Sequence, residues 1–381
     1  MKKQLTIILI GLTFFGCSSS GEKGISSKEY HFITSDSIKV DFLTPMKLRD
    51  YSPANETYLL STEWNGEIIE INKKGEVSSH FELSEDGPNA ISNQTGIGYL
   101  KDEITLYAME RGFVQFDRKG QIIQEFSIPY SHSYLFFLPY LHIFPSENGF
   151  TYLKPLQSAD FKDGMGEKFY QHYYDMPLLE RLDTLADQTE PAMKFPKTSS
   201  YSDGENHGIY IPIIRKKGPS WYVSLWLENQ FYVYKEENND LVLDTTVTVP
   251  IKDLIQYKSV AMSESEHFFD INKGIQPGHI SDILLTENKI VVIYRKGLSA
   301  FQTQSVTSDG KEITLEKMDP FYAAIYDSEL NLLDPEVPFP AGIEYPSVVN
   351  DRGEIAVMKK PSHFETEEDQ LTIYQLKLAS E

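Results

Sequence analysis

A short polar turn followed by a strand of alternating apolar residues recurs six times along this chain of 381 residues. Tyr58, Ile104 and Phe150 begin three of these strands, and each is 46 residues from the next. Later spacings widen to roughly 65–72 residues. Polar turns between alternating apolar stretches predict β-hairpins. The six turns are Ser52–Asn55, Lys101–Glu103, Ser146–Gly149, Lys216–Pro219, Glu287–Lys289 and Asn350–Gly353.

A second hairpin pattern follows the first two of these strands. Ile68–Val77 resembles Phe113–Ile122, and the same shape returns at Phe231–Asn238 and Ile325–Leu332. Two hairpins make a four-stranded unit. Six such units predict an all-β chain folded as a six-bladed β-propeller of four-stranded antiparallel blades. A β-sandwich with irregular loops is the alternative, although it does not explain the equal first spacings.

Closure of such a ring requires the two ends of the chain to meet. Glu29–Phe42 carries a strand pattern upstream of the first full repeat, and the last repeat ends with Leu371–Leu376. An unpaired edge strand would be left if the ends stayed apart. We therefore predict that an N-terminal strand completes the last blade.

The first 28 residues predict export and a lipid anchor. Lys2 and Lys3 precede Leu5–Phe15, an apolar run that has signal-peptide length and is too short to span a bilayer. The run leads into Phe14-Phe15-Gly16-Cys17, which resembles a bacterial lipobox; a cysteine closing an ordinary signal peptide is the alternative. We divide the chain into a signal peptide (1–16), a flexible lipid-anchored tether (17–28) and a propeller domain (29–381). The expected location is the cell envelope, at the outer membrane.

The net charge and the cysteine and histidine content of the chain limit the classes of partner and cofactor that it can bind. The formal charge of −21 becomes −23 once residues 1–16 and their two lysines are removed. Such an acidic chain is unsuited to a nucleic-acid backbone or to anionic lipid, so we expect membrane attachment through Cys17 and no nucleic acid. Cys17 is the only cysteine, which excludes an internal disulfide. The nine histidines show no metal-ligand spacing, and we expect a monomer without metal or cofactor.

Two short segments carry a family resemblance. Glu85–Asn89 and Ile275–His279 place a Gly-Pro or Pro-Gly pair ahead of an expected innermost strand. Together with the lipobox and the Lys-Lys-Gly turn, they resemble six-bladed propeller lipoproteins of Bacteroidetes type, in the domain-of-unknown-function family numbered 4221. The likeness covers most of the chain and implies a six-bladed propeller and an exported lipoprotein. It implies no catalytic residues, and none is assigned.

Four long connections are expected on one face of the ring. In a four-stranded blade, the connections from second to third strand and from blade to blade share a face. The four long segments that fall on these connections are Pro155–Tyr170, Val249–Gly278, Gly297–Tyr322 and Pro361–Gln370. Long loops in a compact domain are often functional, so this face is the expected working face. Neutral drift on a tolerant face is the alternative.

Residues just after each second strand should surround the channel on that face. They form a locally cationic rim with aromatic side chains, suited to an anionic or sugar-like ligand. Side chains that are merely paired and solvated are the alternative. The candidate ligand-binding residues of this rim are Glu63, Trp64, Arg111, Lys154, Trp226, Tyr294, Arg295 and Lys360.

The sequence is compatible with three functions. The first is a non-enzymatic envelope lipoprotein whose propeller face binds a glycan, a small molecule or a protein. The second is a propeller enzyme acting on a carbohydrate or lactone, which two convergent carboxylates in a deep channel mouth would favour. The third is an envelope assembly scaffold, which a flat apolar patch would favour.

Overall fold

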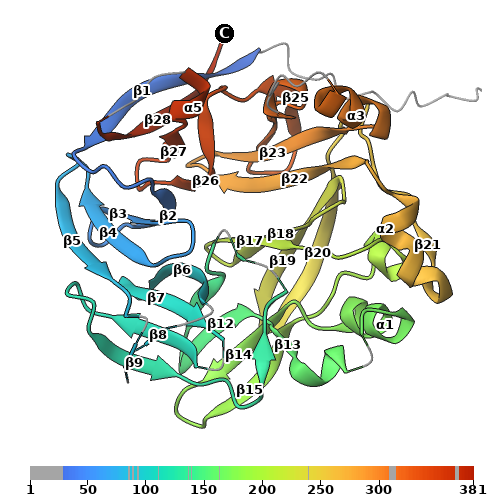
Figure 1. The fold of residues 1–381 in the computed structure, drawn as a ribbon, viewed down its shortest axis with the longest axis horizontal. Coiled ribbons are helices and arrows are strands. Elements are labelled where there is room, and N and C mark those ends of the chain that lie inside the picture. The colour runs from blue at the N-terminus through green and yellow to red at the C-terminus, as the bar shows by residue number, and fades with distance from the viewer. Residues whose placement is uncertain are drawn as a thin grey trace, which may run out of the picture.

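Antiparallel four-stranded sheets arranged around a centre make up most of the structure, which is all-β and propeller-like (Figure 1). The computed structural model describes residues 29–381, apart from 85, 88, 89, 92, 93, 110, 136, 139, 163, 239, 309–314 and 365–368. Cys17, the signal peptide and the tether lie outside the described residues and stay predictions.

Four sheets are separate and four-stranded. The first contains β2 (Lys47–Ser52), β3 (Thr57–Ser61), β4 (Glu67–Asn72) and β5 (Val77–Glu82). The second contains β6 (Gln94–Leu100), β7 (Glu103–Ala108), β8 (Gly112–Phe116) and β9 (Ile122–Phe126). The third contains β22 (Gln276–Leu285), β23 (Lys289–Leu298), β24 (Tyr322–Asp327) and β25 (Leu332–Pro338). The fourth contains β26 (Ile343–Val349), β27 (Ile355–Lys359), β28 (Leu371–Ser380) and β1 (Tyr30–Val40).

The remaining large sheet has eight strands, so four separate four-stranded sheets are present instead of the predicted six. One antiparallel half contains β11 (Ile143–Ser146), β12 (Gly149–Leu153), β14 (Leu179–Asp183) and β15 (Gln188–Met193). The other half contains β17 (Pro212–Lys217), β18 (Ser220–Leu225), β19 (Gln230–Glu237) and β20 (Asp240–Thr248). The halves are joined by a single parallel residue pair, Met193 of β15 with Leu241 of β20, and this one pair merges two four-stranded groups into one sheet.

All six predicted hairpin turns are confirmed. Each joins the first strand of a four-strand group to its second, as Lys101–Glu103 does between β6 and β7. The four predicted second hairpins are also confirmed, since each joins a third strand to a fourth, as in β4–β5 and β24–β25. Of the two motif segments, Gln276–His279 lies inside β22 and not ahead of it, because Pro277 and His279 extend the pairing with β23.

The predicted N-terminal closing strand is confirmed. β1 pairs with β28 in antiparallel register from Tyr30–Ser380 to Val40–Leu371. The first strand of the described chain therefore completes the last sheet. Ile38 and Val40 of β1 are buried together with Tyr58 and Ile373, so the closing strand also enters the hydrophobic core.

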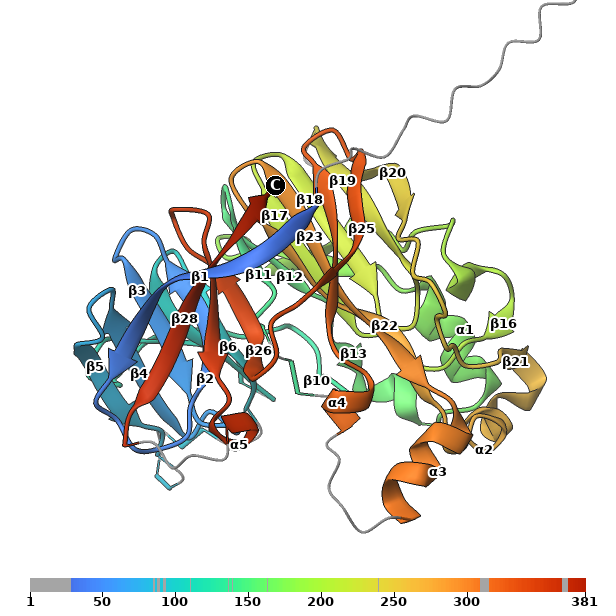
Figure 2. The same cartoon turned by 90° about the horizontal axis from the view of Figure 1, so that it is seen from above.

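The first strands of the six groups, β2, β6, β11, β17, β22 and β26, are called the inner strands here. β2 lies beside β6 and β26, while β22 lies beside β17 and β26. The side that carries the six hairpin turns is the turn side, and the opposite side is the helix side. Figure 2 shows the helices together on the helix side and the C-terminus on the other.

The four long connections lie on the helix side, as expected, and contain most of the short helices. They hold β13 (Leu156–Gln157), η1 (Ser158–Phe161), α1 (Glu167–Asp175), β21 (Val260–Ala261), η3 (Met262–His267), α2 (Phe268–Ile271), α3 (Ala300–Ser308), α4 (Leu315–Met318) and α5 (Pro361–Phe364). Two other connections hold β10 (His132–Ser133), η2 (Ser200–Ser202) and β16 (Glu205–Asn206). None of the helices in the described residues has the length and apolar character needed to cross a membrane.

Aromatic side chains fill the space between neighbouring sheets. α1, which the sequence pattern did not predict as a helix, buries Phe169, Tyr170, Tyr173 and Tyr174 in the largest cluster. The Tyr173 ring stacks on Tyr210 with centroids 4.2 Å apart. Tyr173 and Tyr174 therefore belong to the core and do not form an exposed binding platform.

Candidate functional site

The predicted cationic rim consists largely of side chains that already have partners. Arg111 forms an ion pair with Glu125, at 3.2 Å from Nε to Oε2, and donates from Nη1 to the carbonyl oxygen of Ala90. Arg295 donates from Nε to the carbonyl oxygen of Asp319 at 2.8 Å and lies over the Phe321 ring. These guanidinium groups hold connections against strands.

Lys154 is the most enclosed cation of the rim. Its Nζ is bonded to the carboxylate of Glu180, and both side chains are largely buried. The ammonium group also lies 5.1 Å from the Tyr130 ring centroid, while Tyr152 donates to Glu180 at 2.9 Å. The positive charge of Lys154 is therefore neutralised inside the protein.

The other rim candidates are spread around the helix side. Trp64 is 71 % exposed and meets Phe137 edge to face, whereas Tyr294 is fully buried and donates to the carbonyl oxygen of Pro335. Trp226 lies against His279, and the carbonyl oxygen of Glu63 accepts a hydrogen bond from Arg49. The backbone N–H of Lys360 donates to Gly342.

The structure does not gather the eight rim residues into one site. Leaving Lys360 aside, no hydrogen bond, ion pair or ring contact in the described part of the chain joins two of their side chains. None of the eight lines the central cavity described below. Their role in ligand binding stays a prediction.

The ion pairs Arg111–Glu125 and Lys154–Glu180 of the rim should contribute differently to the free energy of unfolding. Arg111→Ala removes a half-exposed pair and should lower the free energy of unfolding by less than about 1 kcal/mol. Lys154→Ala leaves Glu180 buried without its cation and should cost about 2 kcal/mol or more. Urea unfolding of the two variants measures this; equal losses would contradict the assigned burial of Lys154.

A cavity at the centre of the ring receives side chains from all six inner strands. Its volume is about 350 Å³, and its lining includes Asp50 of β2, Tyr99 of β6, Ile143 of β11, Arg215 of β17, Leu284 of β22 and Ser347 of β26. Most of the lining comes from the half of each inner strand that leads into a hairpin turn. The cavity therefore lies toward the turn side, opposite the predicted working face.

Irregular pairing on the inner strands brings polar side chains to this cavity. The register shifts between Leu48 and Asp50 in β2, between Ile280 and Asp282 in β22, and between Glu344 and Ser347 in β26. A bulge of this kind rotates the residues that follow it relative to regular pleating. Asp50, Asp282 and Ser347 each follow such a shift.

Asp282 is the centre of a buried network beside the cavity. Arg215 contacts both of its carboxylate oxygens, with Nη2 at 2.9 Å and 3.1 Å. Ser347 donates from Oγ at 3.4 Å, and the backbone N–H of Ile283 donates at 2.7 Å. Tyr140 donates its hydroxyl to the same carboxylate and has the Arg215 guanidinium 3.6 Å above its ring. Asp282 is thus saturated with donors.

Tyr140 reaches the network from the connection before β11. Burial, together with the Asp282 carboxylate, raises the pKa of Tyr140, so its hydroxyl stays protonated and donates. The backbone N–H of Ser347 donates to the same hydroxyl oxygen at 3.1 Å. This one side chain therefore links three inner strands, β17, β22 and β26.

Asp50 has a different environment in the same cavity. Each carboxylate oxygen accepts one backbone N–H, from Tyr51 and from Tyr99, both at 2.8 Å. No ion pair is formed by Asp50 among the described residues. Burial raises the pKa of its carboxyl group above the usual value, against the lowering effect of these two N–H groups and of Arg215. The absence of a side chain at Gly98 leaves room for it, since a Cβ there would lie 2.9 Å from Oδ2.

His142 adds an unpartnered polar atom to the lining. Its Nε2 is buried and has no hydrogen-bond partner in the described structure. Burial lowers the pKa of the imidazole to about 3, so the ring is neutral at physiological pH. The cavity thus combines a neutral imidazole, an unpaired carboxylate at Asp50 and an internally paired guanidinium at Arg215.

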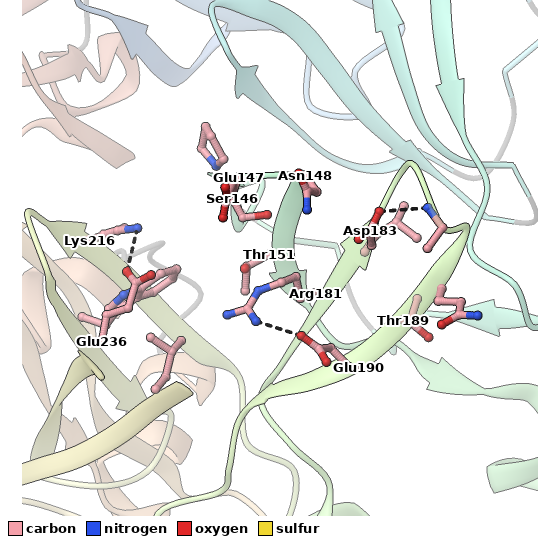
Figure 3. A pocket seen from close by; sticks show the side chains of 16 residues that line it. Ser146, Glu147, Asn148, Thr151, Arg181, Asp183, Thr189, Glu190, Lys216 and Glu236 are labelled. Atoms are coloured by element: carbon pink, nitrogen blue, oxygen red, sulfur yellow. Dashed lines mark hydrogen bonds and ion pairs between the residues drawn. The ribbon is translucent and has the colours of Figure 1, made fainter. Parts of the chain in front are cut away.

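A second hollow of about 330 Å³ lies on the turn side between the halves of the eight-stranded sheet (Figure 3). One ion pair lies on each half of the sheet beside it, Arg181 with Glu190 at 2.8 Å and Lys216 with Glu236 at 3.6 Å (Figure 3). Glu190 and Glu236 are well exposed, which makes this hollow a solvated surface. Lys216 also borders the central cavity.

One group of three side chains in the described residues has metal-ligand spacing. Ligand atoms of Asp203, Glu205 and His207 lie within 4.8 Å of one another, at the exposed end of β16. His207 Nε2 is 2.9 Å from Asp203, and Ser259 donates to Glu205, so the three groups are already tied together. This group lies outside the central cavity.

Comparisons with known proteins agree with the fold. Residues 15–169, less than half of the chain, match the family described as a domain of unknown function (DUF4221). No curated protein matches the sequence. The chain is similar to the crystal structure of a DUF4221 family member from Bacteroides vulgatus, with a TM-score of 0.65 and 12 % identity, over 93 % of this chain and 99 % of that one.

A second solved structure, from Bacteroides fragilis, carries the name of an exported protein. It is similar with a TM-score of 0.52 and 13 % identity, over 92 % of this chain and 95 % of that one. At these identities the likeness concerns the fold alone. The resemblance to the family numbered 4221 is thus supported for the N-terminal part of the sequence and for the propeller-like arrangement.

Proposed function

We propose that this protein is a lipid-anchored envelope protein that binds a small, hydroxyl-rich ligand such as a sugar in its central cavity, without catalysis. The observation that carries the proposal is the cavity itself, which is formed jointly by all six inner strands. Its volume of about 350 Å³ lies within the range of small-molecule sites, about 300–1,000 Å³.

The polar groups of the cavity support a ligand with hydroxyl groups. Each Asp50 oxygen accepts one N–H and keeps further acceptor capacity. Arg215 uses Nε and Nη2 on Asp282, and in the described residues Nη1 has no hydrogen-bond partner. A hydroxyl group can donate to Asp50 and accept from Arg215, a combination that an apolar ligand lacks.

The carboxylates favour binding over catalysis. Acid–base chemistry on a glycosidic bond uses two carboxyl groups that are both available to the substrate. Asp282 accepts from Arg215, Tyr140, Ser347 and Ile283, which leaves Asp50 as the available carboxylate of the pair. One available carboxylate supports recognition and does not supply a nucleophile–acid pair.

The blade number and the anchor belong to the same proposal. The eight-stranded sheet has two antiparallel halves that share one residue pair, so counting each half as a blade gives six blades around the cavity.

Lipidation of Cys17 would hold this propeller at the outer membrane. Palmitate labelling of the protein in a bacterial host should be lost in Cys17→Ser, and unchanged labelling would refute the anchor.

Ligand binding is tested with a panel of neutral mono- and disaccharides. A cavity ligand at saturation should raise the unfolding midpoint by several degrees. Asp50→Asn should weaken binding at least about tenfold, because a charged acceptor is replaced. Asp244→Asn, the same change at a half-exposed pair with Lys235, is the matched control and should bind normally. Equal affinity of both variants, or no shift with any saccharide, would refute the cavity as the site.

Affinity should also depend on pH through Asp50. Because burial raises the pKa of this carboxyl group, it takes up a proton at a higher pH than an exposed aspartate does. The ionised form is the better acceptor, so affinity should fall as the pH is lowered through the raised pKa. Isothermal titration over a pH series measures this, and Asp50→Asn should give a flat profile over the same range.

A further inference from the structure

Exposed apolar side chains are concentrated on the helix side. Of the twelve large hydrophobic residues that are exposed in the described structure, seven lie on connections of this side. They include all four exposed aromatic residues, Trp64, Phe269, Phe301 and Phe364. On the turn side Leu185 lies on a connection, and the other four, which are aliphatic, lie on outer strands in the half nearer the turn side.

These side chains project from separate connections. Phe301 of α3 is 81 % exposed, and Phe269 of α2 is 52 % exposed. Trp64 follows β3, Leu43 precedes β2, and Phe364 lies in α5. Figures 1 and 2 show α2, α3 and α5 distributed around one face of the ring. The Trp64, Phe269 and Phe364 rings contact Phe137, Phe268 and His363, and not one another. A flat surface can contact such dispersed residues simultaneously.

We infer that the helix side docks on a lipid bilayer with zwitterionic headgroups, and that the dispersed aromatic side chains enter its interface. This inference rests on the proposed lipid anchor for its biological setting. Tryptophan and phenylalanine on one face are the residues that peripheral proteins place at the boundary between headgroups and acyl chains. A chain with a formal charge of −23 after signal removal would be repelled by anionic lipid, which favours neutral headgroups.

The length of the N-terminal segment is compatible with this orientation. β1 begins on the turn side, because Tyr30 pairs with Ser380 near the C-terminus. The 12 residues from Ser18 to Glu29 can span at most roughly 40 Å. The 11 residues of β1 extend over roughly 36 Å. The tether is therefore long enough to pass along β1 to a membrane at the helix side.

The orientation also leaves the proposed ligand site accessible. The central cavity lies toward the turn side, so a bilayer at the helix side does not cover it. In the opposite orientation, the bilayer would face the cavity, and none of the four exposed aromatic residues of the described structure would meet the lipid.

Trp64 is a built-in reporter of this contact. The chain has three tryptophans, of which Trp221 is buried and Trp226 half-buried. In lipidated protein reconstituted into vesicles of dibrominated phosphatidylcholine, the emission of Trp64 should be quenched by more than half. Trp64→Phe should abolish that quenching. Full emission of Trp64 in such vesicles would overturn the inference, since the anchor would then hold the protein with another face toward the lipid.

Vesicle binding without the anchor tests the face independently of lipidation. The mature chain carrying Cys17→Ser should bind phosphatidylcholine vesicles and bind more weakly when phosphatidylglycerol is added. Phe269→Ser with Phe301→Ser should weaken binding about tenfold or more. Ile123→Ser with Leu185→Ser, which removes exposed apolar side chains elsewhere, is the matched control and should bind as the parent does.

The remaining outcomes separate this inference from the proposed function. Unchanged vesicle binding of the double variant Phe269→Ser, Phe301→Ser would overturn the inference that the helix side docks on lipid. A photocrosslinker placed at position 301 that captures a protein in place of lipid would also overturn it. Loss of saccharide binding in Asp50→Asn leaves Trp64 quenching unaffected. A failure of the ligand site and a failure of the docking face therefore give different results.

Discussion

Asp282→Ala should lower the free energy of unfolding by roughly 3–5 kcal/mol, because it breaks a buried ion pair from one side only. Arg215 would lose its carboxylate, and the hydroxyl groups of Tyr140 and Ser347 would lose their acceptor. Urea unfolding followed by tryptophan fluorescence measures the loss.

The control for this change is Asp244→Ala, which removes a half-exposed partner of Lys235 and should cost less than about 1 kcal/mol. Replacing both Arg215 and Asp282 by leucine should recover part of the stability lost in Asp282→Ala, since no charge is then left unpaired. If Asp282→Ala were no worse than Asp244→Ala, the network at the centre of the ring would not hold the inner strands together.

Gly75→Ala should destabilise the protein by about 3 kcal/mol or more, through strain and steric overlap at the closing strand. Gly75 lies in the β4–β5 turn with φ of +83°, a conformation that L-residues rarely adopt. A Cβ there would lie 2.0 Å from the carbonyl oxygen of Lys39 in β1. Because that atom belongs to the backbone, β1 itself would have to move.

Gly204→Ala separates the two causes. Gly204 has a similar φ of +93°, but a Cβ there meets nothing within 4 Å. It should show the backbone strain alone, about 1–2 kcal/mol. The difference between the two variants in thermal unfolding then measures the contact between the first sheet and the closing strand. Equal losses would mean that β1 can shift without cost.

Local sequence patterns predicted the hairpins well. The turns at Lys101–Glu103 and Ser146–Gly149 were correctly predicted because turn chemistry and alternation depend on residues a few positions apart. The helix α1 was missed, since its four buried aromatic residues derive their helical setting from the cluster around Tyr210. The separation of the sheets was mispredicted at Met193 and Leu241, where a single pair joins two groups.

The candidate site was much less predictable. Tyr140 donates to Asp282 across 142 residues and contacts Ser347 across 207 residues, and no local pattern marks such contacts. Register shifts in β2 and β26 precede Asp50 and Ser347, which line the cavity, and a shift in β22 precedes Asp282 beside it. Reasoning from a period of two assumes regular pleating and does not anticipate such shifts. The rim cations were selected by position after a strand, without knowledge of partners such as Glu180.

The sequence by itself determined the hairpin repeat and the all-β class, because both depend on apolar alternation and turn residues within a short window. It also predicted the pairing of the two ends, because a ring of repeats leaves an unpaired edge unless its first and last strands meet. It also indicated the helix side as the location of the long connections. The tertiary structure decided which polar groups meet. Arg215 is neutralised by Asp282 while Asp50 forms no ion pair among the described residues, a difference that arises only when strands from six distant parts of the chain meet around one cavity.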